Sequence, residues 1–402
     1  MTIGEFSRRL IRLVQEGLSK KLSLQQSEIH RTGENSINGV WNTENTVGCR
    51  GDGVPLLQAP WRITFDTNPD DCNLSCTMCE EHSEFSMLKR ARIETGRPHR
   101  RMDIGIIRTT VKELVSSGLR EIIPSTMGEP LLYSHFNDIL DMCSEFHVKL
   151  NLTTNGTWLK FGPEHWAELI CPVASDVKIS WNGVSNSVQE GIMRGSKLEQ
   201  RVSDLKKFIA VRDKIAAAGG NRSGVTLQCT FMESNLTELP HLVRFASDIG
   251  ADRVKGHHLW VHFNEMKEQD MRRSVASISR WNRVANECRR AARSCGRERG
   301  RPLTLQNFAP LEISGNNHLT SILVCPFLGR EAWINYEGRF DPCCAPDAER
   351  KSLGSFGNVS GNGGIIRIWK GPEYRELLAN YLSHPLCSKC TMRRPVGEMM
   401  KI

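Results

Sequence analysis

Hydrophobic and polar positions alternate in short segments between residues 61 and 260, and longer segments with helical periodicity lie between them. Alternation over about four to eight residues is typical of strands, whereas apolar residues three or four apart are typical of amphipathic helices. The alternating segments predict six strands, at 61–66, 120–124, 149–154, 176–181, 225–231 and 252–258. The periodic segments predict helices at 104–117, 135–146, 163–170, 197–218 and 236–249. This order predicts an α/β fold in which a parallel sheet forms an open or partial barrel.

The flanking segments have different patterns. Residues 1–24 place apolar side chains on one side of a helix and basic ones on the other, and residues 25–55 favour an extended connection. We expect this helix to pack on the rest of the chain, with an anionic membrane or partner as the alternative. Toward the C-terminus, the pattern predicts an Arg-rich helix at 268–294, hairpin strands at 331–335 and 339–341, and a helix at 372–382. The expected units are an N-terminal segment (1–60), the barrel (61–295), a linker (296–320) and a small α+β domain (321–402).

Composition narrows the function classes. The net charge of +8 over 402 residues is small, so a charge-driven nucleic-acid binder is not favoured. The basic residues between 272 and 301 favour a solvated helix face over RNA modification, because Trp281 is the one aromatic residue among them and no known RNA-binding module is present. No stretch approaches the roughly 18 apolar residues of a membrane span, and Arg12 interrupts the apolar segment that a signal peptide would need. We therefore expect a cytoplasmic protein with no nucleic-acid partner.

Fourteen cysteines in a chain without an export signal favour metal binding over a disulfide scaffold. Six of them are scattered, and we expect these to behave as small buried hydrophobic residues. The others form a compact C-x3-C-x2-C group, Cys72, Cys76 and Cys79, and a C-terminal group, Cys325, Cys343, Cys344, Cys387 and Cys390. Such groups of thiolates suit zinc or an iron–sulfur cluster.

The number of ligands separates the two metals at the first group and favours the iron–sulfur cluster. A structural zinc site needs four ligands, and His82 is the local candidate for the fourth. An iron–sulfur cluster held by three thiolates would instead leave one iron open to a substrate or cofactor. The zinc alternative implies a structural role, and the iron–sulfur alternative implies catalysis.

The first cysteine group lies directly after the first predicted strand. In this the sequence resembles the radical S-adenosylmethionine (SAM) superfamily, and its tail resembles the SPASM or twitch domain found in that superfamily. The resemblance covers about residues 61–392. It implies a partial (β/α)6 barrel, a SAM-binding [4Fe–4S] cluster on Cys72, Cys76 and Cys79, and one auxiliary [4Fe–4S] cluster. The family usually has an aromatic residue before the last cysteine, where this chain has Met78.

Other segments agree with the resemblance. The family's "GGE"-like and "TNG" segments correspond to 128–130 and 153–156 here, and the family's ribose- and carboxylate-binding positions correspond to Ser180 and Arg194. The implied SAM-binding residues are Gly128, Glu129, Pro130, Thr154, Asn155, Ser180 and Arg194. In the tail, the order of hairpin, double cysteine, Gly-Asn, Trp and final C-x2-C pair is similar to SPASM. The implied auxiliary ligands are Cys325, Cys343, Cys387 and Cys390, with Cys344 as an alternate for Cys343.

The resemblance implies that SAM is cleaved reductively to a 5′-deoxyadenosyl radical, which abstracts a hydrogen atom from the substrate. A flavodoxin or ferredoxin would supply the electron. We expect a small polar substrate, such as a sugar or aminocyclitol, with oxidation or epimerisation as the outcome. The first alternative is epimerisation, crosslinking or thioether formation on a ribosomally made peptide, and the second is a non-catalytic, metal-stabilised binding protein.

Three residues near strand ends are candidates for steps on the substrate radical. Cys229 is a candidate hydrogen-atom donor from the fifth strand, although a buried structural role is the favoured interpretation. His257 and His258 end the sixth strand and are candidate proton acceptors. If the strand continued, alternation would direct His258 and His262 to one side and His257 to the other.

Overall fold

The computed structural model describes residues 46–395, apart from residues 126, 300–301, 313–322, 362 and 391. The amphipathic helix predicted at 1–24 lies outside the described residues. None of the described helices is long and apolar enough to cross a membrane.

A nine-stranded sheet is the main feature of the described chain, in the order β12-β11-β3-β4-β5-β6-β7-β8-β9. All six strands predicted for the barrel are present and parallel to their neighbours: β3 (Arg62–Phe65), β4 (Glu121–Ile123), β5 (Lys149–Thr154), β6 (Ala174–Ser180), β7 (Gly224–Phe231) and β8 (Arg253–His258). The predicted α/β class with a parallel sheet is therefore confirmed.

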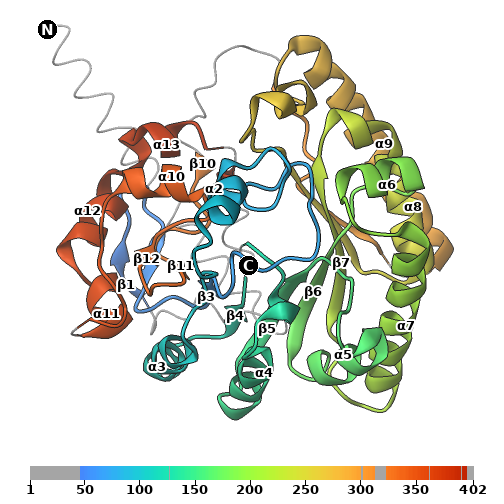
Figure 1. Cartoon of the computed structure of the whole chain (residues 1–402). Coiled ribbons are helices and arrows are strands. Elements are labelled where there is room, and N and C mark those ends of the chain that lie inside the picture. Colours follow the sequence, from blue (N-terminus) through green and yellow to red (C-terminus); the bar gives the residue numbers. More distant parts are fainter. Residues whose placement is uncertain are drawn as a thin grey trace, which may run out of the picture. The chain divides into compact units, whose positions relative to one another are not determined.

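Helices follow the strands and lie along one side of the sheet (Figure 1). They are α3 (Ile104–Val115), α4 (Phe136–Glu145), α5 (Gly162–Ile170), α7 (Leu198–Ala217), α8 (Leu239–Ile249) and α9 (Val275–Arg299). Two shorter helices, α2 (Met87–Thr95) and α6 (Asn186–Ile192), were not predicted. The start of α9 also differs from the predicted 268, because residues 264–269 form a 3-10 turn and the Asp270 carboxylate caps the following turn through Arg272 N.

Side chains alternate between two faces along each strand. The outer face, toward the helices, is apolar and fully buried, as Ile63, Ile122, Val177 and Leu227 show. The opposite or inner face carries polar side chains that bond across strands, such as the Arg62–Glu121 pair and Thr226 Oγ1 on Asp176. Because Val177 and Ile179 belong to the core, alternation assigns Lys178 between them to the inner face.

The C-terminal segment joins the same sheet instead of forming a separate core. Its hairpin, β11 (Glu331–Ile334) and β12 (Phe340–Asp341), was predicted, but β11 also pairs in parallel with β3. Helices α10 (Asp347–Arg350), α11 (Gly364–Trp369), α12 (Pro372–Asn380) and α13 (Pro385–Ser388) follow, and β10 (Leu323–Val324) pairs with β13 (Arg394–Pro395). At the other edge, β9 (Thr304–Gln306) lies within the predicted linker and pairs with β8.

The segment before β3 is also ordered by contacts with the tail. Residues predicted as an extended connection form the β1 (Thr46–Cys49) and β2 (Pro55–Leu57) hairpin. Between these strands, Arg50 Nη1 donates to the carbonyls of Cys325 and Leu328, at 2.8 and 2.6 Å. The carbonyl of Leu57 accepts from the Trp369 indole at 3.0 Å. The N-terminal boundary predicted at residue 60 therefore does not separate this hairpin from the tail.

Candidate functional site

The loop after β3 carries Cys72, Cys76 and Cys79 at the carboxyl end of the strand, where parallel α/β folds collect functional groups. Two main-chain bonds fix the loop against the segment after α6, since Ser75 N donates to Arg194 O and Thr77 N to Ile192 O, both at 2.9 Å. An apolar cluster that includes Leu74 and Met193 packs under the loop. The three cysteines are therefore held in a defined loop.

The three thiols face one another closely enough to interact. Burial raises the pKa of Cys72 to about 12, and the neighbouring Cys79 raises it further. Burial and the other two thiols likewise raise the pKa of Cys76. N–H groups point at the sulfur of Cys72, from Leu74 N at 3.5 Å and Asn155 Nδ2 at 3.8 Å. Such donors stabilise thiolates bound to a metal cluster.

The donor set fits an iron–sulfur cluster better than a zinc ion. Within the part of the chain that the structure describes, no three His, Cys, Asp or Glu side chains are close enough to hold a single metal ion. The Nε2 atom of His82, the candidate fourth zinc ligand, lies 2.8 Å from Pro69 O in a buried position. Three soft thiols without a fourth protein ligand suit a cluster with one open iron.

An ion-pair network holds the base of the cysteine loop. Asp70 is buried and accepts from Arg92, Arg97 and Arg100. Arg100 also bonds Glu81 at 2.6 Å, so one guanidinium joins residues on both sides of the thiols. These contacts keep the pKa of Asp70 well below its usual range against the opposing effect of burial.

The segment 128–130 joins the cysteine loop to the end of β5. A Cβ atom on Gly128, at φ +76°, would lie 2.2 Å from Asn68 O, so glycine is required for this approach. The Glu129 carboxylate is buried and accepts from Thr154 Oγ1 at 2.7 Å and Asn155 N at 2.6 Å. Burial raises the pKa of Glu129 to about 7. Because its oxygens bond to the protein, the carboxylate serves to connect two strand ends.

Arg201 belongs to this site but was missed from the sequence, because it is one of several charged residues in α7. It is 2% exposed and donates to the carbonyls of Asn155 and Ser180, which follow β5 and end β6. Its guanidinium lies over the Trp181 ring, 4.9 Å from the centroid. Burial lowers the pKa of Arg201 to about 10, while Cys76 and Glu129 oppose this effect. Arg201 thus links the strand ends around the thiols.

The other two implied SAM-binding residues lie near the loop in different ways. The carbonyl of Ser180 accepts from Arg201 Nη2. The side chain of Arg194 is half exposed and pairs with Glu84, beyond the third cysteine. Arg194 is therefore beside the cysteine loop, whereas Ser180 is joined to the site through Arg201.

The three candidates on β7 and β8 are divided between the two faces. Cys229 belongs to the apolar core and is 1% exposed. Burial raises the pKa of its thiol, and the nearby Cys288 of α9 contributes to the increase. His258 packs on Phe231 and Trp281. Both side chains therefore lie on the outer face of the sheet, opposite the inner face that carries the polar residues. This placement does not support Cys229 as a hydrogen-atom donor or His258 as a proton acceptor.

His257 lies on the inner face. Its Nε2 atom is 3.3 Å from Thr230 Oγ1 on β7, and its side chain is accessible to solvent. The surrounding protein and the nearby Lys255 lower the pKa of His257 to about 4. The imidazole is therefore neutral near pH 7, where so low a pKa makes it only a weak base.

The C-terminal thiols also gather in one place. Burial raises the pKa of Cys343 to about 12, and Cys325, Cys387 and Cys390 contribute to the increase. N–H groups of residues 327 and 328 point at the Cys325 sulfur at 3.5 Å. Cys344 also interacts with this group of thiols. In its thiolate form it would also raise the pKa of Lys255 on β8. Cys344 therefore lies between the thiol group and the inner face.

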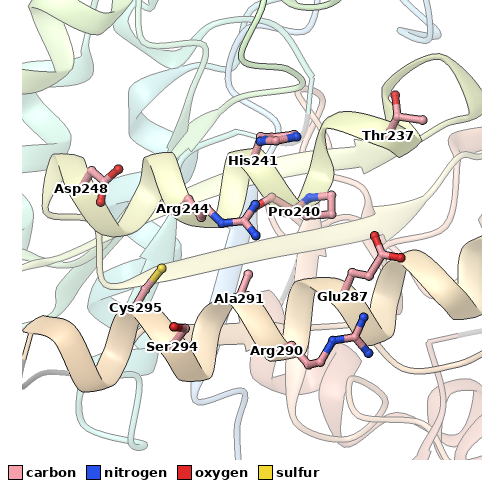
Figure 2. Close-up of a pocket in the computed structure, with 10 residues that line it drawn as sticks. All are labelled: Thr237, Pro240, His241, Arg244, Asp248, Glu287, Arg290, Ala291, Ser294 and Cys295. Atoms are coloured by element: carbon pink, nitrogen blue, oxygen red, sulfur yellow. The ribbon is translucent and has the colours of Figure 1, made fainter.

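A pocket of about 680 Å³ lies away from these thiols, between α8 and α9 on the helical side of the sheet. Figure 2 shows Arg244 and Asp248 of α8 and Glu287 and Arg290 of α9 around it. Its lining includes no residue that the sequence assigned to a site.

Two family models match the chain. Residues 69–246 match the radical SAM superfamily, and residues 325–391 match SPASM, an iron–sulfur cluster-binding domain. These ranges include the two groups of cysteines described above.

Individual proteins are similar at low identity. The mycofactocin maturase MftC of Mycobacterium tuberculosis is 24% identical over 274 residues, which cover 65% of this chain and 61% of the maturase. The tungsten-containing aldehyde ferredoxin oxidoreductase cofactor-modifying protein of Pyrococcus furiosus is 22% identical, over 80% of this chain and 85% of its own length. The chain thus spans less than two thirds of the length of the maturase.

Solved structures share the fold. SuiB of Streptococcus suis bound to S-adenosylmethionine superimposes with a TM-score of 0.57 at 16% identity, over 83% of this chain and 73% of SuiB. SuiB bound to its precursor peptide SuiA gives 0.54 at 14% identity, over 90% of this chain and 79% of SuiB.

Proposed function

Because this chain joins a radical SAM domain to a C-terminal SPASM domain, we propose that it is an enzyme that abstracts a hydrogen atom from a peptide. These two domains imply SAM and [4Fe–4S] clusters as cofactors. When bound, the cofactors supply a 5′-deoxyadenosyl radical, and the protein orients the substrate and excludes water. The observation that carries the proposal is the loop of three mutually interacting thiols at the end of β3.

The residues around the thiols have distinct roles in this proposal. Cys72, Cys76 and Cys79 hold the SAM-binding cluster, and the Asp70 network fixes the loop that carries them. Glu129 ties the segment after β4 to the end of β5, and Arg201 ties the end of β5 to the end of β6. These contacts would fix the segments at 128–130, 154–155 and 180 that are proposed to bind SAM. Arg194 offers a guanidinium to the SAM carboxylate.

The tail holds the auxiliary cluster on four of its five thiols. Cys325, Cys343, Cys387 and Cys390 are the proposed ligands, as the resemblance to SPASM implies, and their effects on one another's pKa support a common site. Cys344 interacts with the same thiols and stays the alternate for Cys343. Four protein ligands leave no open iron, which suits electron transfer or structure. When bound, this cluster would supply an acceptor for an electron from the substrate radical. His257 stays the candidate acceptor of the accompanying proton, although its lowered pKa makes it a weak base near pH 7. A flavodoxin or ferredoxin as the initial electron donor stays a prediction.

A peptide substrate has better support than the small polar molecule expected from the sequence. MftC is named as a maturase, and SuiB was solved with a precursor peptide. The Pyrococcus protein, by its name, modifies a cofactor, so it favours the other class. The first two observations lead us to propose the peptide, and they leave open whether it is epimerised, crosslinked or oxidised.

The cluster assignment is tested with a triple Cys72→Ser, Cys76→Ser, Cys79→Ser variant, purified anaerobically. We expect it to lose about half of the bound iron and all production of 5′-deoxyadenosine from SAM and dithionite, because one of two clusters is missing. Cys49→Ser is the control, since Cys49 is an exposed thiol outside both groups. A triple variant that still makes 5′-deoxyadenosine would contradict the proposal.

The substrate class is tested by deuterium transfer. Cells are grown on deuterated medium and lysed, and the lysate is separated into a peptide fraction and a fraction of lower molecular mass. Each fraction is then incubated with the enzyme, SAM and dithionite. We expect deuterium in 5′-deoxyadenosine with the peptide fraction alone. Transfer from the low-mass fraction alone would restore the small-molecule expectation.

A further inference from the structure

Two lysines face the inner side of the sheet, and neither has an ion-pair partner in the part of the chain that the structure describes. Lys178 lies on β6, between core residues Val177 and Ile179, and is 8% exposed. Lys255 lies on β8, before Gly256, whose Cβ position is filled by the Phe231 ring of the outer face. Alternation therefore directs both lysines to the inner face.

The carboxylates of this face bond to other cations. Glu121 and Glu331 both pair with Arg62, at 2.6 and 3.1 Å. Asp176 accepts from Arg253 at 2.9 Å and from Thr226 Oγ1. Among the described residues, no carboxylate lies within ion-pair distance of either lysine. The hydrogen bond recorded for Lys178 goes to the neutral Asn151 Oδ1, whose amide in turn donates to Glu121.

The two lysines lie near enough to affect each other. Burial and the neighbouring Lys255 lower the pKa of Lys178 to about 7. Burial and Arg62 lower the pKa of Lys255 in the same direction. Gln228 of β7, which is in register with Lys255, adds an amide to the same face. Asp176 acts against the lowering of both pKa values, and Glu121 and Glu331 each act on one lysine, but these carboxylates bond to arginines. Burying an ammonium with so little compensation is costly, so an anion at this position would stabilise both side chains.

We propose that Lys178 and Lys255 form a binding site for a carboxylate of the substrate. The site rests on the proposed function, since it lies on the inner face behind the cysteine loop and would select the residue that reaches the radical. The carboxylate belongs to an Asp or Glu side chain or to the peptide's C-terminus. Two ammonium groups and an amide suit a carboxylate, because they supply hydrogen-bond donors and positive charge.

The test measures binding by calorimetry to the cluster-loaded protein, without reductant. N-acetyl-glutamate amide presents a side-chain carboxylate, N-acetylglycine presents a terminal one, and N-acetylglutamine amide is the neutral match. We expect at least one carboxylate probe to bind about tenfold or more tighter than the neutral probe, in the range of a charge-assisted hydrogen bond. The probe that binds identifies the source of the carboxylate.

Variants locate the site. Lys178→Met and Lys255→Met should each weaken the tighter probe about tenfold, whereas Lys207→Met on the exposed side of α7 should not. Lys178→Gln and Lys255→Gln repeat the test if a methionine variant does not fold. Equal binding of charged and neutral probes by the wild type, tighter binding of inorganic phosphate, or an equal loss in Lys207→Met would overturn the site. Because no turnover is measured, wild-type 5′-deoxyadenosine production tests the proposed function separately.

Discussion

At the scale of single residues, Arg201 shows how a buried charge organises the site. Its guanidinium is the donor shared by the main chains that follow β5 and end β6, and its hydrophobic surroundings hold it in place over Trp181. A buried cation of this kind is recognisable from sequence only when its partners are known, because those partners are carbonyls that any residue provides. This is why the sequence predicted Asn155 and Ser180 but not the residue that joins them.

Arg201→Met should destabilise the protein by about 2–4 kcal/mol, because two buried carbonyls lose a charged donor. It should also raise the KM for SAM more than it lowers kcat, since Arg201 positions the strand ends and does not touch the reacting atoms. Chemical denaturation and steady-state 5′-deoxyadenosine assays measure the two effects. Arg108→Met, which removes a surface ion pair with Glu145, is the matched control and should change neither. An unchanged KM with lowered stability would leave Arg201 only a structural role.

His258 makes stability depend on pH. Burial lowers its pKa from 6.5 to about 3, so the unfolded chain binds a proton that the native protein does not between these values. The contribution of His258 to the free energy of unfolding is therefore present above pH 6.5 and is lost as the pH falls below 6.5. Between pH 7.5 and 5.5 the loss is about 1 kcal/mol. His258→Phe, which keeps an aromatic ring against Trp281, should flatten this slope in denaturation curves, whereas the exposed His241→Phe should not. Parallel curves for the wild type and His258→Phe would refute this.

At the scale of elements, the loops that meet above the strands depend on glycine. Gly128 and Gly118 both adopt positive φ, but only Gly128 is crowded, by Asn68 O and Asp71 O of the cysteine loop. Substitutions at these two glycines therefore distinguish the effect of a positive φ alone from the effect of a steric clash.

Gly128→Ala should displace the cysteine loop and reduce 5′-deoxyadenosine production at least tenfold, because its Cβ would lie 2.2 Å from a carbonyl oxygen. Gly118→Ala should cost about 1 kcal/mol of stability through its φ and leave activity intact, since its Cβ would meet no atom within 4 Å. Turnover assays and thermal unfolding compare the two. Equal activity in both variants would contradict a tight approach at Gly128.

Local patterns predicted elements well where the two faces differ. The six barrel strands alternate strongly, and β6 does so with Asp176 and Lys178 between core residues, a signal that also identifies the inner face. The short β9 carries no apolar alternation, so it was assigned to a linker. Cys229 and His258 lie on the outer face, as the register of Phe231 and Gly256 shows, whereas their positions in the sequence indicated only that they are near strand ends.

At the scale of the molecule, the pairing of β11 with β3 makes one sheet of two domains. This pairing was not predictable from local pattern, because it joins segments that are far apart in the sequence and whose alternation is compatible with many partners. Arg62 of β3 connects the two domains, because it forms ion pairs with Glu121 of the barrel and Glu331 of the tail. The β1–β2 hairpin adds a second connection through Arg50 and Cys325.

A chain that ends at residue 312 should therefore fail to fold as an independent barrel. Removing β11 would leave β3 as an unpaired edge and expose the side of the core that Ala332 and Ile334 cover, and such edges promote aggregation. We expect insoluble or aggregated protein with no cooperative thermal transition, whereas a chain that ends at residue 395 keeps every described strand and should unfold cooperatively. Circular dichroism and size-exclusion chromatography distinguish the two. A monomeric, folded chain of 312 residues that binds iron at the first cysteine group would contradict this prediction, because it would show that the strands β3 to β9 form a stable sheet without the tail.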